Sequence, residues 1–174
     1  MQSRDDMKNL ILIGMPAVGK STLGVLLAKA MCCGFCDTDL LIQKSCGTSL
    51  CDYIERHGST EFIKFEEQIL CSLNVKNTVV ATGGSAVYGK DAMAHLKANG
   101  VIIYLRASAD ELKKRIGDIK TRGVVLLHGS TVEDILEERL PLYEKYADIT
   151  IDCDRSAPEE NLEKIISAVN LYLS

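Results

Sequence analysis

Three short and almost entirely apolar runs constrain the fold of this chain more than any other feature. They cover residues 10–13, 78–81 and 101–105, and none shows the alternating polar positions of a strand with one face in water. An apolar run of this length is typical of a strand that is buried on both faces of a sheet. Because such sheets are parallel and carry helices on both sides, the runs predict an α/β fold.

Segments with helical periodicity separate these runs, as crossovers between parallel strands require. Apolar spacing and capping patterns predict helices that start near residues 20, 49, 60, 108, 131 and 158. Two weaker strands are predicted at residues 35–38 and 147–153. The chain of 174 residues is long enough for one domain. We therefore expect residues 1–174 to form a single three-layer domain around a parallel five-stranded sheet.

A glycine-bearing stretch, GMPAVGKST at residues 14–22, follows the first apolar run. Its glycines, lysine and serine match the pattern G-x-x-x-x-G-K-[ST], in which main-chain N–H groups surround phosphate oxygens. The loop lies between a strand and a helix, so it directs its amides and the positive end of the helix dipole toward an anion. The alternative interpretation, in which the stretch binds no ligand, is a tight turn with an exposed lysine. The predicted nucleotide-binding residues of this loop are Gly14, Ala17, Val18, Gly19, Lys20, Ser21 and Thr22.

Two acids on alternate positions, Asp37 and Asp39, end the second predicted strand. In a parallel sheet this end faces the ligand crevice. One carboxylate can bind Mg²⁺ beside Ser21, while the other accepts a proton from an attacking alcohol. Spacing alone does not say which acid has which role, and a helix cap or a surface acid pair is the alternative.

Together with ATGGS at residues 81–85 and RLPLY at residues 139–143, these motifs give an ordered set along nearly the whole chain. In this order the sequence resembles the shikimate kinases, which have the nucleoside-monophosphate-kinase-like P-loop fold. The resemblance implies transfer of the γ-phosphate of ATP to a hydroxyl of shikimate, with Mg²⁺ as cofactor. It implies that Lys20 and Ser21 act on phosphate and metal, that Asp37 supports Mg²⁺, and that Asp39 binds the acceptor hydroxyls as base.

The resemblance also implies an acceptor-binding region at about residues 39–66 and a lid at about residues 118–130. Gly83 and Gly84 match positions where the backbone approaches the substrate, and Arg139 matches an arginine that binds its carboxylate. The remaining implied residues are the lid arginine Arg122 and, beside adenine, Arg115 and Arg155. For Arg115 and its lysine neighbours, a solvated helix face is an equally good interpretation.

The chain departs from the family pattern on the acceptor side. Ile63 replaces the arginine of F-R-x-x-E, and Ser85 replaces the third glycine of GGG. Lys64 is a doubtful substitute for the arginine because it points about 100° further round the helix. Glu66 matches a family glutamate, although an exposed helical acid is an alternative. The sequence therefore specifies phosphoryl transfer more firmly than it specifies shikimate.

Charge and composition limit the partners. The net charge of −4 lacks the basic excess of nucleic-acid or membrane-surface binding, and no apolar stretch approaches the roughly 20 residues of a membrane helix. Seven cysteines, an odd number, indicate reduced and buried thiols. We expect a cytoplasmic monomer that acts on a small molecule. The alternatives left open are a kinase for another hydroxylated metabolite and a non-catalytic nucleotide-binding module.

Overall fold

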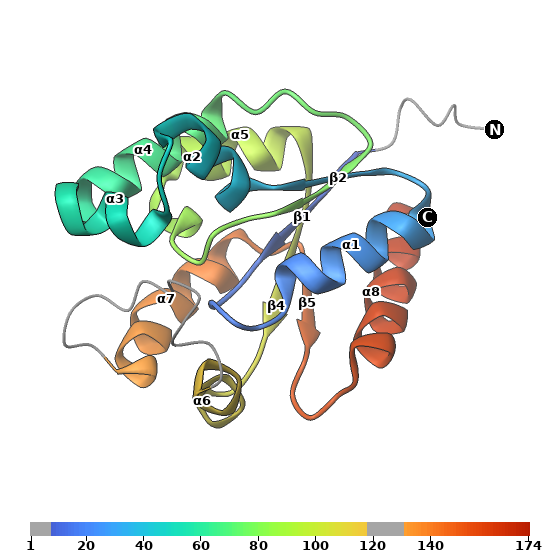
Figure 1. Ribbon diagram of the computed structural model, residues 1–174. Coiled ribbons are helices and arrows are strands. Elements are labelled where there is room, and N and C mark those ends of the chain that lie inside the picture. The colour runs from blue at the N-terminus through green and yellow to red at the C-terminus, as the bar shows by residue number, and fades with distance from the viewer. Residues whose placement is uncertain (1–7, 118–130) are drawn as a thin grey trace.

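One sheet of five parallel strands lies at the centre of the molecule (Figure 1). The computed structural model describes residues 8–117 and 131–174. The strand order is β2-β3-β1-β4-β5. Their bounds are β1 Asn9–Ile13, β2 Gly34–Asp37, β3 Thr78–Ala81, β4 Gly100–Arg106 and β5 Ile149–Asp152. The predicted five-stranded parallel sheet is confirmed.

Helices cover both faces of this sheet and complete the predicted three layers. Helices α1 and α8 pack against each other on one face, and α5 packs against β4 on the other (Figure 1). The helices are α1 Lys20–Met31, α2 Thr38–Cys46, α3 Leu50–His57, α4 Ser59–Cys71, α5 Lys90–Asn99, α6 Ala109–Gly117, α7 Val132–Tyr146 and α8 Pro158–Leu173, with a 3₁₀ turn, η2, at Ala86–Tyr88.

Two helices were absent from the sequence prediction, α2 and α5. Helix α2 carries its apolar residues consecutively, in Leu40, Leu41 and Ile42, so it has no clear apolar stripe, and only Ile42 of these is buried. Helix α5 follows Gly89, which provides no side-chain cap, and its buried residues are only Ala92, Met93 and Leu96. Helix α5 therefore lacks a start signal, whereas α2 has an N-cap, Asp37, but no apolar stripe behind it.

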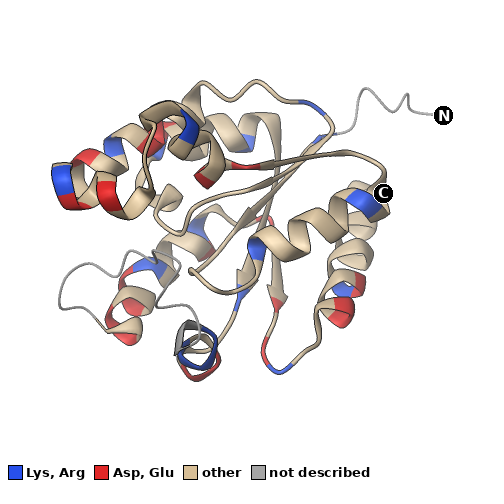
Figure 2. Ribbon diagram, in the orientation of Figure 1, with Lys and Arg blue, Asp and Glu red and all other residues tan. Residues whose placement is uncertain are grey.

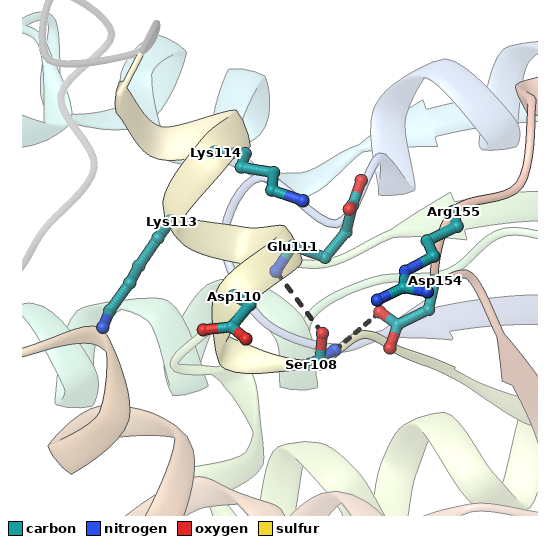
Figure 3. A pocket seen from close by; sticks show the side chains of 7 residues that line it. All are labelled: Ser108, Asp110, Glu111, Lys113, Lys114, Asp154 and Arg155. Carbon is teal, nitrogen blue, oxygen red and sulfur yellow. Dashed lines mark hydrogen bonds between the residues drawn. The ribbon is translucent and has the colours of Figure 1, made fainter.

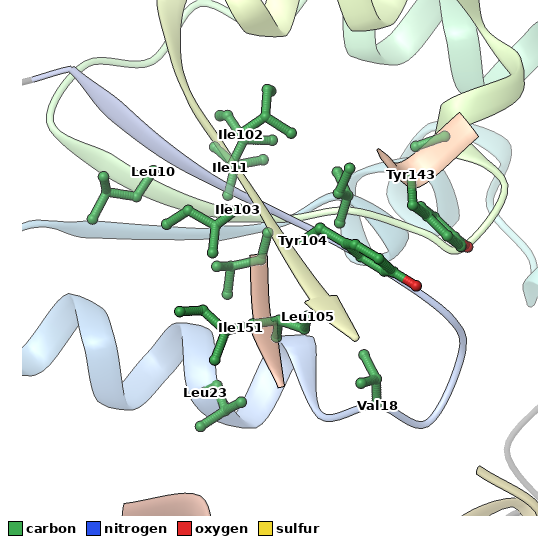
Figure 4. Packing of buried hydrophobic residues seen from close by; sticks show 14 of the residues in the cluster. Leu10, Ile11, Val18, Leu23, Ile102, Ile103, Tyr104, Leu105, Tyr143 and Ile151 are labelled. Carbon is green, nitrogen blue, oxygen red and sulfur yellow. The ribbon is translucent and has the colours of Figure 1, made fainter. Parts of the chain in front are cut away.

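The core is centred on β1, which pairs with β3 on one side and β4 on the other. Leu10 aligns with Val79 of β3 and with Val101 of β4, and all three are buried. Figure 4 shows the aliphatic side chains of β1 and β4 packed together, with the Tyr104 ring stacked on Tyr143 of α7 at a centroid distance of 5.0 Å. Because all strands run the same way, their carboxyl ends meet at one edge of the sheet, where the motif residues lie.

Charged residues lie mainly along the helices and near the strand ends (Figure 2). Within residues 8–117 and 131–174, no helix has the length and hydropathy needed to cross a bilayer. All seven cysteines are free thiols, as predicted. The expectation that they are buried is wrong for Cys32 and Cys51, which are exposed, and only Cys153 is fully buried.

Candidate active site

The loop between β1 and α1 has the backbone geometry that phosphate binding requires. Gly14 and Gly19 have φ angles of 143° and 107°, in the region that favours glycine. A Cβ at Gly14 would lie 2.5 Å from the main-chain oxygen of Leu105, so no larger residue fits there. The first turn of α1 contains no acidic residue and receives no side-chain cap. Its N–H groups and dipole are therefore available to an anion.

Lys20 is folded into this loop, with only 8% of its surface exposed. Its Nζ donates hydrogen bonds to the main-chain oxygens of Gly14 at 2.7 Å and Met15 at 2.9 Å. Burial lowers the pKa of Lys20 to about 8, although the nearby carboxylates of Asp39 and Asp37 partly oppose this effect. The alternative of a turn with an exposed lysine is therefore wrong.

Ser21 and Asp37 form a ready pair of oxygen ligands. The Ser21 hydroxyl donates to Asp37 Oδ2 at 2.6 Å, and Asp37 Oδ1 accepts a hydrogen bond from the N–H of Asp39 at 3.0 Å. Asp37 is thus also the N-cap of α2, so the alternative interpretation as a helix cap is confirmed. The same carboxylate is also positioned beside Ser21 as a metal ligand. No group of three or more His, Cys, Asp or Glu side chains suited to a metal occurs in the described part of the chain. A hydroxyl and one carboxylate suit Mg²⁺, which takes its other ligands from phosphates and water.

Asp39 lies in the first turn of α2, and its carboxylate faces the segment that follows β3. Burial and the charge of Asp37 raise the pKa of Asp39, and Lys20 opposes them. A Cβ at Gly83 would lie 3.0 Å from Asp39 Oδ1, and one at Gly84 would lie 2.7 Å from Pro16 Cδ. The two glycines therefore keep open a space between the acid and the phosphate loop.

Arg139 reaches the same space from α7. It is only 3% exposed, and its Nε donates to the hydroxyl of Tyr88 at 3.1 Å, while its guanidinium lies over the Tyr88 ring. Its Nη1 would be 3.0 Å from a Cβ at Gly84. A buried guanidinium positioned in this way is suited to hold a carboxylate.

Tyr88 and Tyr143 support the site and were not predicted as site residues. The Tyr88 hydroxyl accepts from Arg139 and donates to Glu138 at 2.8 Å. The Tyr143 hydroxyl donates to the main-chain oxygen of Gly84 at 2.7 Å. The spacing of Arg139 and Tyr143, four positions apart on one helix, is the sequence signal that places them on the same face. Nothing comparable in the sequence points to Tyr88.

Glu66 of α4 is buried, with 1% of its surface exposed, so the alternative of an exposed helical acid is wrong. The Ser85 hydroxyl donates to its Oε2 at 2.5 Å. Burial raises the pKa of Glu66 to about 7; the Ser85 hydrogen bond opposes the shift and the charge of Asp39 adds to it. Lys64 lies on the exposed side of α4 and pairs with Glu61 at 2.7 Å, whereas Ile63 is half-buried.

Arg115 and Arg155 lie on the far side of the phosphate loop. Arg115 donates to the main-chain oxygens of Val18 at 2.9 Å and Cys153 at 3.0 Å, so it ties the phosphate loop to the end of β5. Figure 3 shows the neighbouring pocket, of about 460 Å³, between α6 and the turn after β5. It is lined by Ser108, Asp110, Glu111, Lys113, Lys114, Asp154 and Arg155. Its volume is within the range of small-molecule sites.

The predicted lid, residues 118–130, and Arg122 within it lie outside the described residues. The other predicted residues come from α1, β2, α2, α6, α7 and the segments that follow β1, β3 and β5. The charges of Asp39, Arg139, Asp37 and Glu66 all act on the pKa of Lys20, which shows that these groups are electrostatic neighbours. The edge at the carboxyl ends of the strands combines a phosphate loop, a pair of oxygen ligands and a cluster of charged side chains around Gly83 and Gly84.

Comparisons with known proteins agree on one family. The sequence model described as Shikimate kinase matches residues 16–170. The chain belongs to the shikimate kinase family. A shikimate kinase from Caldanaerobacter subterraneus subsp. tengcongensis is 36% identical over 165 residues, which cover 93% of this chain and 96% of that protein. One from Thermodesulfovibrio yellowstonii is also 36% identical, over 92% of this chain and 94% of that protein.

A solved structure supports the same assignment. The shikimate kinase from Acinetobacter baumannii in complex with shikimate has a TM-score of 0.86 and 28% sequence identity, and the match covers 95% of this chain and 94% of that one. The family resemblance inferred from the ordered motifs is thereby confirmed, and so is the predicted P-loop kinase fold. As a member of the shikimate kinase family, the chain is a phosphotransferase.

Proposed function

We propose that this protein transfers the γ-phosphate of ATP to a hydroxyl of shikimate in a reaction that requires Mg²⁺. The observation that carries the proposal is the convergence of Lys20, the Ser21–Asp37 pair and the Asp39–Arg139 pocket at one sheet edge, in a chain of the shikimate kinase family. Phosphoryl transfer depends mainly on positioning and on charge stabilisation, and these residues supply both.

On the nucleotide side, the main-chain N–H groups between Gly14 and Thr22 surround the phosphates of ATP. When ATP binds, Lys20 exchanges its hydrogen bonds to the main-chain oxygens of Gly14 and Met15 for hydrogen bonds to the terminal phosphates. Ser21 and Asp37 hold the metal, for which their two adjacent oxygens are suited. Bound Mg²⁺ would neutralise charge that develops on the phosphoryl oxygens. The pocket beside Arg155, with Arg115 at the edge of the phosphate loop, accommodates the adenine.

On the acceptor side, Asp39 accepts the proton of the attacking hydroxyl, a role for which its raised pKa is suited. Arg139 binds the carboxylate of the acceptor, and Gly83 and Gly84 admit its ring close to the backbone. The acceptor-binding region comprises about residues 39–66 of the single domain formed by residues 1–174. The family resemblance assigns Arg122 to the transferring phosphate and residues 118–130 to a lid, both outside the described residues.

One observation favours a different acceptor molecule. Helix α4 presents no cationic side chain to the acceptor site. Ile63 cannot donate to a carboxylate, and Lys64 is paired with Glu61 on the exposed side. The loss of one arm of a carboxylate clamp costs about 2 kcal/mol, or about thirtyfold in affinity. Another hydroxylated acid is therefore the alternative substrate. A non-catalytic nucleotide-binding role is disfavoured because Lys20, Asp37 and Asp39 are all in place.

The experiment is an ADP-release assay with ATP, Mg²⁺ and a panel of shikimate, quinate and simple sugar acids. We expect saturable turnover with shikimate, and we expect Asp39→Asn to lower kcat by about a hundredfold or more while nucleotide binding persists. If another acid were turned over rapidly while shikimate saturated the enzyme only weakly, that acid would be the substrate in place of shikimate. Nucleotide binding without turnover of any acid would support the non-catalytic alternative.

The same proposal includes a cytoplasmic monomer with no nucleic-acid or membrane partner. The net charge of −4 supports the absence of polyanion binding. Light scattering of the purified protein tests the oligomeric state, and a mass of twice the 19.1 kDa chain would contradict it.

A further inference from the structure

One oxygen of the buried Glu66 carboxyl has no hydrogen-bond partner. Oε2 accepts from Ser85, but Oε1 is inaccessible to solvent and bonds to nothing among the described residues. A buried acceptor without a partner costs about 1–3 kcal/mol. A buried polar atom of this kind normally finds a partner, which here must come from a ligand or a water.

The free oxygen lies beside Gly83, on the side where a Cβ of that residue would point. A Cβ at Gly83 would lie 2.4 Å from Glu66 Oε1 and 3.0 Å from Asp39 Oδ1. The two carboxyl groups, from α4 and α2, therefore face one space above the half-exposed Gly83. An acceptor that reaches Asp39 passes within hydrogen-bonding range of Glu66.

The hydroxyl of Ser85 decides where that oxygen points. Ser85 directly precedes the 3₁₀ turn η2, and its bond to Oε2 joins this turn to α4 across 19 positions of the chain. Glycine at this position has no side chain with which to make the bond. Without the bond, either oxygen of the carboxyl can face the pocket, and the rotation of the group is no longer restricted.

We propose that Ser85 is a positioning residue, which holds Glu66 so that Oε1 accepts a hydrogen bond from an acceptor hydroxyl next to the one that Asp39 takes. The inference rests on the proposed function of this site and adds a substrate class to it. Two acids that face one space select a molecule with hydroxyl groups on adjacent carbons. The α4 side of the pocket thus recognises a hydroxyl, since Lys64 is turned to solvent.

The experiment compares acceptor kinetics of the wild type with Ser85→Ala and Ser85→Thr. We expect Ser85→Ala to raise the KM for the acceptor about tenfold with an unchanged KM for ATP, because one hydrogen bond to an ionisable group is misplaced. Ser85→Thr keeps the hydroxyl and should restore the wild-type value. The matched control is Ser72→Ala, which removes a serine hydroxyl that bonds to Ile69 at the end of α4. It should change neither KM.

A double variant of Ser85 and Glu66 distinguishes a positioning role of Ser85 from a general effect of its removal on the structure. If Ser85 acts through Glu66, the double variant Ser85→Ala/Glu66→Gln should bind the acceptor no more weakly than Glu66→Gln alone. An acceptor without the hydroxyl adjacent to the reacting one should not distinguish Ser85→Ala from wild type. Additive losses, or an equal loss with this deoxy acceptor, would overturn the proposal.

A second measurement keeps this inference separate from the proposed function. If no acceptor is turned over, the proposed function fails, but carboxyl-carbon NMR of Glu66 still reports on Ser85. The charges that act on Glu66 are those of Asp39 on α2, Arg139 on α7 and Lys20 on α1. Because the Ser85 bond lowers the pKa of Glu66, Ser85→Ala should move its titration midpoint upward from about 7. An unchanged midpoint would show that Ser85 does not hold Glu66.

Discussion

Replacement of Glu66 by glutamine is expected to stabilise the ligand-free protein at neutral and alkaline pH. Glutamine has the same size as glutamate and can accept the Ser85 hydrogen bond, but it carries no charge to desolvate. Burial raises the pKa of Glu66 from an ordinary 4.5 to about 7. The folded protein therefore holds a proton on Glu66 over a pH range in which the unfolded chain has released it.

The linkage between proton binding and folding gives the size of the effect. The contribution of Glu66 to stability is fully present below pH 4.5 and is lost as the pH rises through about 7. The difference between these two pKa values corresponds to about 3 kcal/mol. Since Glu66 is 1% exposed, solvent screening does not reduce this figure substantially. Glu66→Gln should equal the wild type near pH 4.5 and exceed it by about 3 kcal/mol near pH 8.

Urea denaturation at a series of pH values, without nucleotide or acceptor, measures this difference directly. The control is Glu67→Gln, which removes the half-buried neighbouring carboxylate that accepts from the N–H of Asp91 at 3.0 Å. If the difference between wild type and Glu66→Gln were the same near pH 5 as near pH 8, the carboxyl would not be held in the buried environment described, and the argument would be refuted.

Three further substitutions test the pocket and the loop. Lys20→Ala should weaken Mg·ATP binding by about ten- to a hundredfold in calorimetry, because it removes charge-assisted hydrogen bonds to phosphate; an unchanged affinity would remove Lys20 from the site. Tyr88→Phe frees Arg139 Nε and should raise the KM for the acceptor about fivefold, with the KM for ATP as internal control. Gly83→Ala places a Cβ 2.4 Å from Glu66 Oε1 and should lower kcat/KM for the acceptor by about ten- to a hundredfold; a wild-type value would mean that the pocket lies elsewhere.

The sheet was predictable from the sequence because its central strands are buried on both faces. Residues 10–13, 78–81 and 101–105 are apolar except for Thr78, and all lie in the observed β1, β3 and β4. The edge strand β2 is partly exposed, so its signal was weaker, and its observed bounds differ by one residue from the expected 35–38. Helix α2 has a cap in Asp37 but no apolar stripe, and α5 has no side-chain cap, so tertiary packing contributes more than local sequence to defining them.

The phosphate loop and its ligands could be predicted because they depend on local sequence and on the direction of the strands. Asp37 ends β2, while Lys20 and Ser21 begin the helix that follows β1, and parallel strands bring their carboxyl ends and the segments after them together. Tyr88 and the Ser85–Glu66 pair depend instead on how η2, α4 and α7 pack. No periodicity encodes contacts between residues 19 to 51 positions apart, so only the structure could supply them.

The burial of Glu66 was not predicted from the sequence, where an exposed helical acid was an alternative. Phe62, Glu66 and Leu70 follow one another at intervals of four, and all three are buried on one face of α4. An acid in an apolar stripe costs stability unless a partner satisfies it, and here one oxygen is left without a partner. Glutamine would fill the same space at lower cost above neutral pH. Under the proposal, the acceptor donates a hydrogen bond to this carboxyl, so the stabilisation of Glu66→Gln and its loss of acceptor affinity should appear in the same variant.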